Sequence, residues 1–303
     1  MSPNPAETEA VTPWLAELSA TGRDLVEIAK PRITTMVVFT TAIGVWLAPG
    51  SIGTARTALL FLGTAMLVAS ANMLNCWYER DTDALMLRTR LRPIPAGRLD
   101  AWSGFAAGIA LGVFSIPILA LAVNPLTALL GAIAHTTYVW AYTPLKRVTP
   151  LALEVGAIPG AIPPLMGWTA GTGALAVPGW FLFGLLFFWQ LPHFLAIGWR
   201  HRVDYGEAGF RILPTLDPTG ARTSRQALLF TLALLPVSLA PTWLGAAGSV
   251  YAAGALVLTL LFLAAAARFW KTTTDAAALQ LFLVSIAWLP AVLFLFVVDR
   301  VAG

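Results

Sequence analysis

The chain has 303 residues, 58% of them hydrophobic and only 11% charged, with a mean hydropathy of +0.76 and a formal net charge of +4. A soluble protein of this size needs far more polar surface, and a transmembrane β-barrel would alternate polar and apolar residues over short strands. The long apolar runs instead predict an all-α, polytopic membrane protein, because helices satisfy their own backbone hydrogen bonds in lipid. The single cysteine, Cys76, excludes an intramolecular disulfide.

The amino-terminal residues predict a tail rather than a membrane segment. Residues 1–23 are rich in Pro, Ala, Glu and Thr, and they lack the charged start and apolar core of a signal peptide. We therefore expect a disordered cytoplasmic tail, followed by a single transmembrane domain over residues 24–303. Nine spans are predicted in that domain, at 33–48, 58–77, 102–123, 125–142, 150–169, 178–199, 227–244, 250–269 and 276–298.

The basic residues predict the orientation of these spans. With the amino terminus inside, 17 of the 19 Lys and Arg residues fall in cytoplasmic segments, and only Arg56 and Arg300 fall outside. Cytoplasmic loops are usually rich in Lys and Arg, so we expect a cytoplasmic amino terminus and an external carboxyl terminus. The positive charge is thus explained by membrane topology and not by nucleic-acid binding. Both long loops, 79–101 and 200–226, lie inside, which predicts a cytoplasmic-side active site.

The first long loop begins with a ladder of polar side chains. Asn75, Glu79 and Asp83 are spaced four residues apart, so on a helix they share one face and rise about 6 Å per step. Carboxylate and amide oxygens suit Mg²⁺, which proteins commonly hold together with substrate phosphates. Arg88, Arg90 and Arg92 follow, and their planar guanidinium groups suit phosphate oxygens. The same residues also fit a plain juxtamembrane loop in which acids balance topology-setting arginines.

The connection between the fourth and fifth spans carries a second group of candidates. Lys146 and Arg147 lie at the predicted membrane edge, and Glu154 lies about one turn into the next helix. An acid within a span is a candidate functional residue, although a carboxylate reaching back to Lys146 explains it equally well. Six glycines and prolines between 156 and 167 predict a broken helix of the kind that lines a cavity.

The end of the sixth span carries a third group. Pro192 is expected to kink the helix beside Gln190 and His193 and to free backbone carbonyls in a polar pocket. The second long loop then supplies Asp204 and, about one turn later, a further acid. His193 is a candidate metal or haem ligand, although a lone histidine at a membrane edge is more often structural. Asp204 also fits a solvated loop acid.

Together these groups favour chemistry on a diphosphate. A metal ion neutralises the charge that grows on a diphosphate leaving group, and Lys and Arg side chains complete the clamp. Two inside loops that combine carboxylates with arginines could provide both. An apolar tunnel between the helices would house a long hydrocarbon tail.

Ordered motifs along the chain resemble those of a known family. The segment NCWYERDTD resembles the N-x-x-x-D-x-x-x-D motif of the intramembrane prenyltransferases, the UbiA superfamily. More narrowly, KPRI, RDTD…RTRLRPIPAG, YTPLKR, GAIPPLMGW and WQLPHF…DY…AG…LP together are similar to the protohaem IX farnesyltransferases of that superfamily. The likeness runs from about residue 27 to 215, and the last three spans are supported by hydropathy alone.

The resemblance implies a nine-helix enzyme that transfers the farnesyl group of farnesyl diphosphate to a vinyl group of haem b, with addition of water, giving haem O. It implies Mg²⁺ as the cofactor, with Mn²⁺ as the alternative ion, and haem b as a substrate. By motif, the implied catalytic and metal-binding residues are Asn75, Glu79, Asp83 and Asp204. The implied contacts to diphosphate and haem are Arg88, Arg92, Lys146, Arg147 and His193.

The resemblance also implies a place in the cell and a pathway partner. The protein is expected in the bacterial cytoplasmic (inner) membrane, in contact with lipid, where haem O serves the cofactor biosynthesis of haem-copper oxidases. A haem A synthase or a terminal oxidase assembly protein is the implied receiver of the product. The chain departs from the family pattern at Glu79, where aspartate is usual, and at Ala152, where asparagine is expected. Its second acidic motif is not a clean pair of aspartates.

Two other functions remain open from the sequence. A prenyltransferase of the same fold could act on an aromatic compound or on another tetrapyrrole. A transporter of haem or another lipophile could use Gly- and Pro-rich helices as gates. A two-sided transport path would need polar groups at both ends, whereas here the acids cluster inside.

Overall fold

Helices form at each of the nine apolar stretches. The computed structural model describes residues 5–50 and 52–301, and it contains no β-strand within them, as the all-α prediction requires. The helices at these stretches are α2 (Pro31–Leu47), α3 (Thr54–Tyr78), α5 (Ala101–Ile118) with the π-helix η1 (Leu119–Val123), α6 (Pro125–Thr136) with the π-helix η2 (Thr137–Tyr142), α8 (Ala152–Thr172), α9 (Val177–Arg200), α11 (Ala221–Trp243), α12 (Ser249–Thr272) and α13 (Asp275–Val298).

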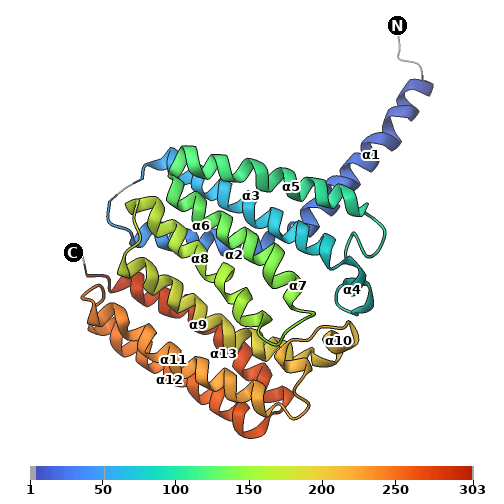
Figure 1. Cartoon of the computed structure of the whole chain (residues 1–303). Helices are drawn as coiled ribbons and strands as arrows, with labels where there is room; N and C mark the ends of the chain where they lie inside the picture. Colours follow the sequence, from blue (N-terminus) through green and yellow to red (C-terminus); the bar gives the residue numbers. More distant parts are fainter. Residues whose placement is uncertain (1–4, 51, 302–303) are drawn as a thin grey trace.

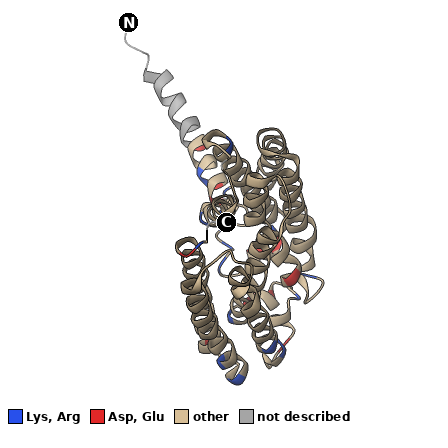
Figure 2. Ribbon diagram, turned by 90° about the vertical axis from the view of Figure 1, so that its left-hand side faces the viewer, with Lys and Arg blue, Asp and Glu red and all other residues tan. Residues whose placement is uncertain are grey.

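Six of these segments in the described part of the chain are long and apolar enough to cross a membrane, namely α3, α5 with η1, α9, α11, α12 and α13. Helix α2 is apolar but shorter. In Figure 2, long stretches of helix are uncharged, and the coloured charges lie mainly near helix ends and in the connections. A polytopic helical architecture is therefore confirmed, whereas the exact number of nine spans stays a prediction.

The amino-terminal segment includes a helix, and the disordered cytoplasmic tail expected over residues 1–23 stays a prediction. Helix α1 runs from Pro5 to Ile28 and projects away from the bundle in Figure 1. Residues 1–4 lie outside the described part. The expectation came from a polar composition, but this segment is also rich in alanine, glutamate and leucine, which are strong helix formers.

Four short helices lie in the connections, and two of them hold the predicted acidic motifs. These are α4 (Arg80–Leu85), α7 (Thr143–Leu145), α10 (Arg202–Glu207) and the 3₁₀ helix η3 (Leu213–Thr215). Helices α4 and α10 lie at the same end of the bundle (Figure 1). The fold therefore places both long loops, which are far apart in sequence, at one end of the molecule.

Helix α8 is continuous, so the expectation of a broken helix is wrong. It runs unbroken past its internal prolines, and its glycines allow close packing instead. A Cβ atom on Gly167 would lie 2.0 Å from the backbone oxygen of Thr41, and one on Gly44 would lie 2.0 Å from the backbone oxygen of Pro164. Helices α2 and α8 therefore meet backbone to backbone, which brings both to the wall of the central cavity. Helix α9 likewise continues through Pro192.

Candidate functional site

The predicted acidic ladder, Asn75, Glu79 and Asp83, lies where α3 passes into α4. The helix is interrupted at Glu79, yet the backbone N–H of Glu79 donates to Asn75 O at 2.9 Å and that of Asp83 donates to Glu79 O at 2.7 Å. The helical register is therefore kept across the junction. All three side chains are buried, with exposed fractions of 2%, 4% and 1%.

A basic side chain contacts each member of the ladder. The three cations come from different connections: Lys30 precedes α2, Lys146 follows α7, and Arg92 lies in the first long loop. These cations offset the cost of burying two carboxylates, because an unpaired buried charge is strongly unfavourable. The contacts are Lys30 Nζ to Asn75 Oδ1 at 3.1 Å, Lys146 Nζ to Glu79 Oε1 at 2.5 Å, and Arg92 Nη1 to Asp83 Oδ2 at 2.6 Å.

The electrostatics of the three cations differ. Burial alone would lower the pKa of Lys146, but the neighbouring Glu79 carboxylate outweighs it and raises the pKa above its usual value. Burial opposes the charge of Arg92 in the same way, and Asp83 likewise raises its pKa. Burial lowers the pKa of Lys30, which faces only the neutral amide of Asn75 at hydrogen-bonding distance. Lys146 and Arg92 are therefore the two firmly charged groups at the ladder.

The oxygen atoms of the ladder fit a hard divalent cation that shares its coordination with a phosphate ligand. Asp83 Oδ1 is buried and has no hydrogen-bond partner among the described residues. Within the same part of the chain, no three Asp, Glu, His or Cys side chains are grouped closely enough to hold a metal by themselves. Mg²⁺ usually takes one or two carboxylates and completes its shell with water and phosphate oxygens. The donor set is of that kind.

The second long loop closes over the first one. Asp204, on α10, accepts a hydrogen bond from the backbone N–H of Leu87 at 3.2 Å. Next to it, Arg88 Nη2 donates to the hydroxyl of Tyr205 at 3.1 Å. The structure thus brings Asp204 to the backbone of the loop that carries Arg88, and within the described residues its side chain makes no hydrogen bond or ion pair with the ladder itself.

Arg147 lies at the side of the ladder. Its Nη2 donates to Thr82 Oγ1 at 3.1 Å, and its Nε is buried without a partner in the described residues. Its neighbour Lys146 accepts, through its carbonyl, a hydrogen bond from the backbone N–H of Arg211 at 2.7 Å. This connection therefore links the ladder to the second long loop.

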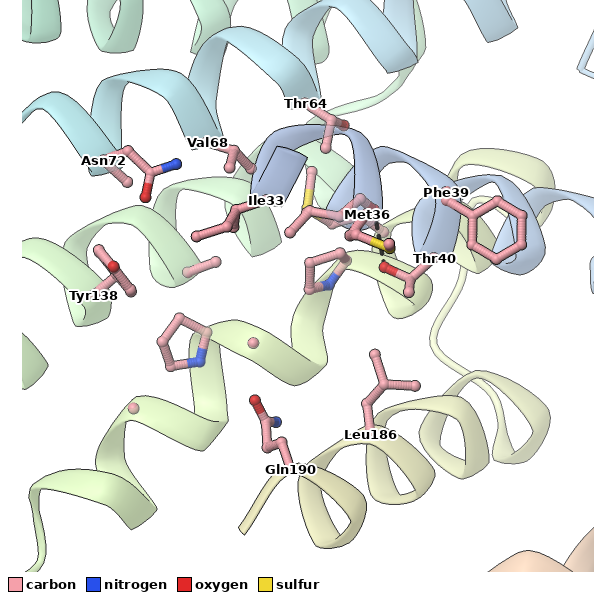
Figure 3. Close-up of a pocket in the computed structure, with 18 of the residues that line it drawn as sticks. Ile33, Met36, Phe39, Thr40, Thr64, Val68, Asn72, Tyr138, Leu186 and Gln190 are labelled. Atoms are coloured by element: carbon pink, nitrogen blue, oxygen red, sulfur yellow. Dashed lines mark hydrogen bonds between the residues drawn. The ribbon is translucent and has the colours of Figure 1, made fainter. Parts of the chain in front are cut away.

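An apolar cavity of about 650 Å³ lies between the helices next to the ladder. Asn72 and Tyr138 lie at one end of it in Figure 3, while Phe39 of α2 lies at the other. Tyr142 also lines the cavity, and its ring centroid is 4.7 Å from Lys146 Nζ. The expected apolar tunnel is therefore present, and a shared aromatic residue connects it to the charged cluster.

The glycines of α8 give the cavity its shape. A Cβ atom on Gly156 would lie 2.6 Å from the ring of Tyr142, and one on Gly160 would lie 2.2 Å from Gln190 Oε1. Gln190 projects from α9 towards α8 (Figure 3), where its Nε2 donates to the carbonyl of Ala157 at 2.8 Å. His193 lines the same cavity and lies about two turns before the end of α9, after which the second acidic loop begins.

Several polar contacts were missed from the sequence. Lys30 stands in the KPRI motif directly before Pro31, and neither that motif nor the charge distribution predicts its contact with Asn75. The hydroxyl of Thr143 accepts a hydrogen bond from Asn75 Nδ2 at 3.2 Å, and no spacing rule points to it. Glu154 accepts from Gln226 Nε2 of α11 at 2.5 Å, so it joins two helices and does not reach back to Lys146.

The chain is similar to known proteins over nearly all of this architecture. Residues 37–296 match the UbiA prenyltransferase family. The chain is 54% identical to a protoheme IX farnesyltransferase of Anaeromyxobacter dehalogenans over 78% of this chain and 80% of that one. It is 43% identical to a protoheme IX farnesyltransferase of Myxococcus xanthus over 94% and 97% of the two chains.

Solved structures share the fold at lower identity. A digeranylgeranylglyceryl phosphate synthase superposes with a TM-score of 0.78 at 17% identity, covering 92% of this chain and 98% of that one. A UbiA homologue from Archaeoglobus fulgidus bound to GPP and Mg²⁺ superposes with a TM-score of 0.64 at 17% identity, covering 90% and 99%. With the family match over residues 37–296, these relatives show that the chain is an integral, multi-pass membrane protein and belongs to the UbiA prenyltransferase family.

Proposed function

We propose that this protein transfers the farnesyl group of farnesyl diphosphate to a vinyl group of haem b, giving haem O for haem-copper oxidases. The observation that carries the proposal is a buried, cation-paired acidic ladder beside a 650 Å³ apolar cavity. Its relatives named protoheme IX farnesyltransferase support haem as the acceptor. The homologue bound to GPP and Mg²⁺ supports a metal-dependent reaction on a prenyl diphosphate.

In this proposal Asn75, Glu79 and Asp83 hold Mg²⁺, or Mn²⁺ in its place, and Asp204 contributes from the second loop. The ion supplies neutralising charge for the leaving diphosphate. Lys146 and Arg92 compensate Glu79 and Asp83 in this structure, and both would be placed to contact diphosphate oxygens if a divalent cation were bound by the two carboxylates. Lys146 and Arg92 would thus have an anionic partner both with and without substrate.

Two further arginines complete the diphosphate site. Arg88 lies against Tyr205 on the solvent side, and Arg147 has a buried Nε without a partner in the described part of the chain. Guanidinium groups bind phosphate oxygens through two parallel N–H bonds, which gives direction as well as charge. We assign Arg88 to the outer side of the diphosphate and Arg147 to the inner side, next to Thr82.

The apolar cavity governs the carbon chemistry. The C–O bond of the allylic diphosphate breaks, the vinyl carbon forms a bond to the farnesyl cation, and water adds to the resulting haem-side cation with release of a proton. Bulk water would intercept the allylic cation, so an apolar chamber protects it until the vinyl group attacks. Tyr138 and Tyr142 line the end nearest Lys146, where this cation would form.

The setting in the cell is also proposed. We place the protein in the bacterial inner membrane as a single domain, with the amino terminus and the ladder on the cytoplasmic side, on the basis of the Lys and Arg distribution. Haem O is poorly soluble, so a haem A synthase or an oxidase assembly protein would receive it directly. Nothing in the charge distribution calls for nucleic acid.

The test is a mass spectrum of haems extracted after incubating the purified protein with haem b, farnesyl diphosphate and Mg²⁺. A haem with the mass of hydroxyethylfarnesyl addition is expected from the natural chain and not from Asp83→Ala. Asp81→Ala is the matched control, because Asp81 lies in the same short helix but its side chain is 76% exposed. Unmodified haem b with folded protein and metal present would overturn haem as acceptor and favour an aromatic acceptor or transport.

A further inference from the structure

Arg32 is a charged residue on the wall of the apolar cavity. Among the described residues that line the cavity, it is the only Lys, Arg, Asp or Glu. It lies in the first turn of α2, directly before Ile33. In Figure 3, Ile33 lies towards the end of the cavity that Asn72 marks, and Asn72 is about one turn from Asn75 of the ladder. Arg32 therefore lies near the ladder end of the cavity.

The guanidinium group of Arg32 has no partner in the described structure. Its side chain is exposed, and it makes no hydrogen bond, ion pair or ring contact with residues 5–50 or 52–301. Lys30, two residues earlier, differs because it contacts Asn75 of the ladder. The first turn of α2 contains no acidic residue, although the helix dipole favours negative charge there. Arg32 is therefore available to an anionic group of a bound ligand.

A role in membrane topology alone does not explain the position of Arg32. Arginines at a cytoplasmic edge commonly extend towards lipid headgroups, which accounts for the exposure of the side chain. It does not account for its place on the cavity wall. Met36 and Phe39 of the same helix line the cavity and are nevertheless exposed, so the cavity opens along α2. A ligand that fills the cavity thus reaches Arg32 at its edge.

We infer that Arg32 binds a propionate carboxylate of the haem acceptor. An apolar cavity with a cation at its edge suits a ligand with an apolar body and an anionic group. Haem b has this form, and a guanidinium group binds a carboxylate through two parallel N–H bonds. Each pyrrole of haem b that carries a vinyl group is adjacent to one that carries a propionate. A propionate on Arg32 therefore positions a neighbouring vinyl group close to the ladder, where the farnesyl cation would form.

The inference rests on the proposed function, because it takes haem b as the acceptor. The experiment compares haem b with its dimethyl ester, in which both propionates are uncharged, as ligands of the purified full-length protein. Binding is followed by the Soret band. The natural chain is expected to bind haem b about tenfold more tightly than the ester, or more, because a charged hydrogen bond is lost in the ester. Arg32→Gln is expected to weaken binding of haem b by the same factor and to leave the ester unaffected.

Two further variants complete the comparison. Arg32→Lys keeps the charge but loses the paired N–H groups, so we expect an intermediate ratio of the two affinities. Arg23→Gln is the matched control, because Arg23 is exposed on the preceding helix, α1, and does not line the cavity. It is expected to keep the ratio of the natural chain. In the haem O assay, Arg32→Gln should raise the KM for haem b and leave the KM for farnesyl diphosphate unchanged.

Equal affinities of the natural chain for haem b and the ester would overturn the inference and assign Arg32 to a lipid headgroup. Equal weakening of both ligands in Arg32→Gln would also overturn it, because the effect would then not depend on the propionates. A raised KM for farnesyl diphosphate instead would place Arg32 in the diphosphate site. If the natural chain forms haem O in any of these cases, the proposed function stands. If it neither binds haem b nor forms haem O, both proposals fall.

Discussion

Lys146 Nζ lies 2.5 Å from Glu79 Oε1, and this ion pair joins the connection after α7 to the junction of α3 and α4. Glu79 has 5% of its side chain exposed and Lys146 has 15%, so neither charge is well solvated. Buried pairs of this kind contribute little net stability against an apolar pair, yet removing one partner is costly. The main consequence of the pair is therefore that it holds a cation in place for phosphate binding, and its net contribution to stability is small.

The first prediction concerns the stability of that pair. Lys146→Met leaves Glu79 as a buried carboxylate without its cation, so we expect it to destabilise the protein by about 3–5 kcal/mol. Combining it with Glu79→Gln removes both charges and is expected to recover most of the loss. Thermal unfolding of the purified variants in one detergent would measure this. A double variant as unstable as Lys146→Met would show that the pair is not coupled.

The second prediction concerns the length of the first acid. Glu79→Asp restores the residue that the resembled motif carries, and we expect it to keep activity within about tenfold, because a Mg²⁺ shell completed by water and phosphate tolerates a shift of one methylene. Glu79→Gln loses the charge and is expected to lower kcat/KM by about 100-fold or more. Equal losses in both variants, measured as haem O formation, would contradict a role in metal binding.

The third prediction separates two neighbouring arginines. Arg92 contacts Asp83 at 2.6 Å, whereas Arg90 is exposed and its side chain makes no hydrogen bond or ion pair in the described structure. We expect Arg92→Ala to raise the KM for farnesyl diphosphate by about tenfold or more, because a charge-assisted contact to phosphate contributes about 1.5–3 kcal/mol. Arg90→Ala should leave it unchanged. Equal KM values for both variants would exclude Arg92 from the diphosphate site.

The fourth prediction tests the shape of the cavity. A Cβ atom on Gly160 would lie 2.2 Å from Gln190 Oε1, so Gly160→Ala must displace that side chain into the cavity. We expect the variant to lose about 1–3 kcal/mol of folding stability. We also expect its activity, relative to the natural chain, to fall more with farnesyl diphosphate than with shorter prenyl diphosphates. Gly184→Ala in α9 is the control, since its Cβ would meet only Val237 at 3.6 Å. If Gly160→Ala kept both its folding stability and its preference among prenyl diphosphates of different length, the proposed clash with Gln190 would be refuted.

The fifth prediction concerns removal of the metal. Chelation by EDTA is expected to abolish haem O formation without unfolding the protein, because Lys146 and Arg92 already compensate the carboxylates in its absence. Mg²⁺ should restore activity, and Mn²⁺ should do so as well because it also prefers oxygen ligands. Circular dichroism before and after chelation checks the fold. A chelated protein that still forms haem O would argue against a metal-dependent reaction.

Local sequence was enough to predict the class of the protein and the spacing of the ladder. Apolar runs placed helices at all nine stretches within the described residues, because a membrane helix is specified by its own composition. The interval of four residues put Asn75, Glu79 and Asp83 on one face, since that interval is a property of the helix alone. The same reasoning failed for α8, where proline content was a weaker guide than glycine packing.

Only the tertiary structure decided which groups meet. That Lys146 faces Glu79, that Asp204 reaches the backbone of Leu87, and that Ser285 Oγ lies 2.7 Å from His193 Nδ1 all depend on helices that are far apart in the chain. The periodicity of the sequence does not predict such contacts, because they form between side chains of different helices that pack against one another. The sequence by itself therefore determined a helical membrane protein with an acidic ladder on one helix face, whereas packing between helices decided how its charges are paired and where its cavity lies.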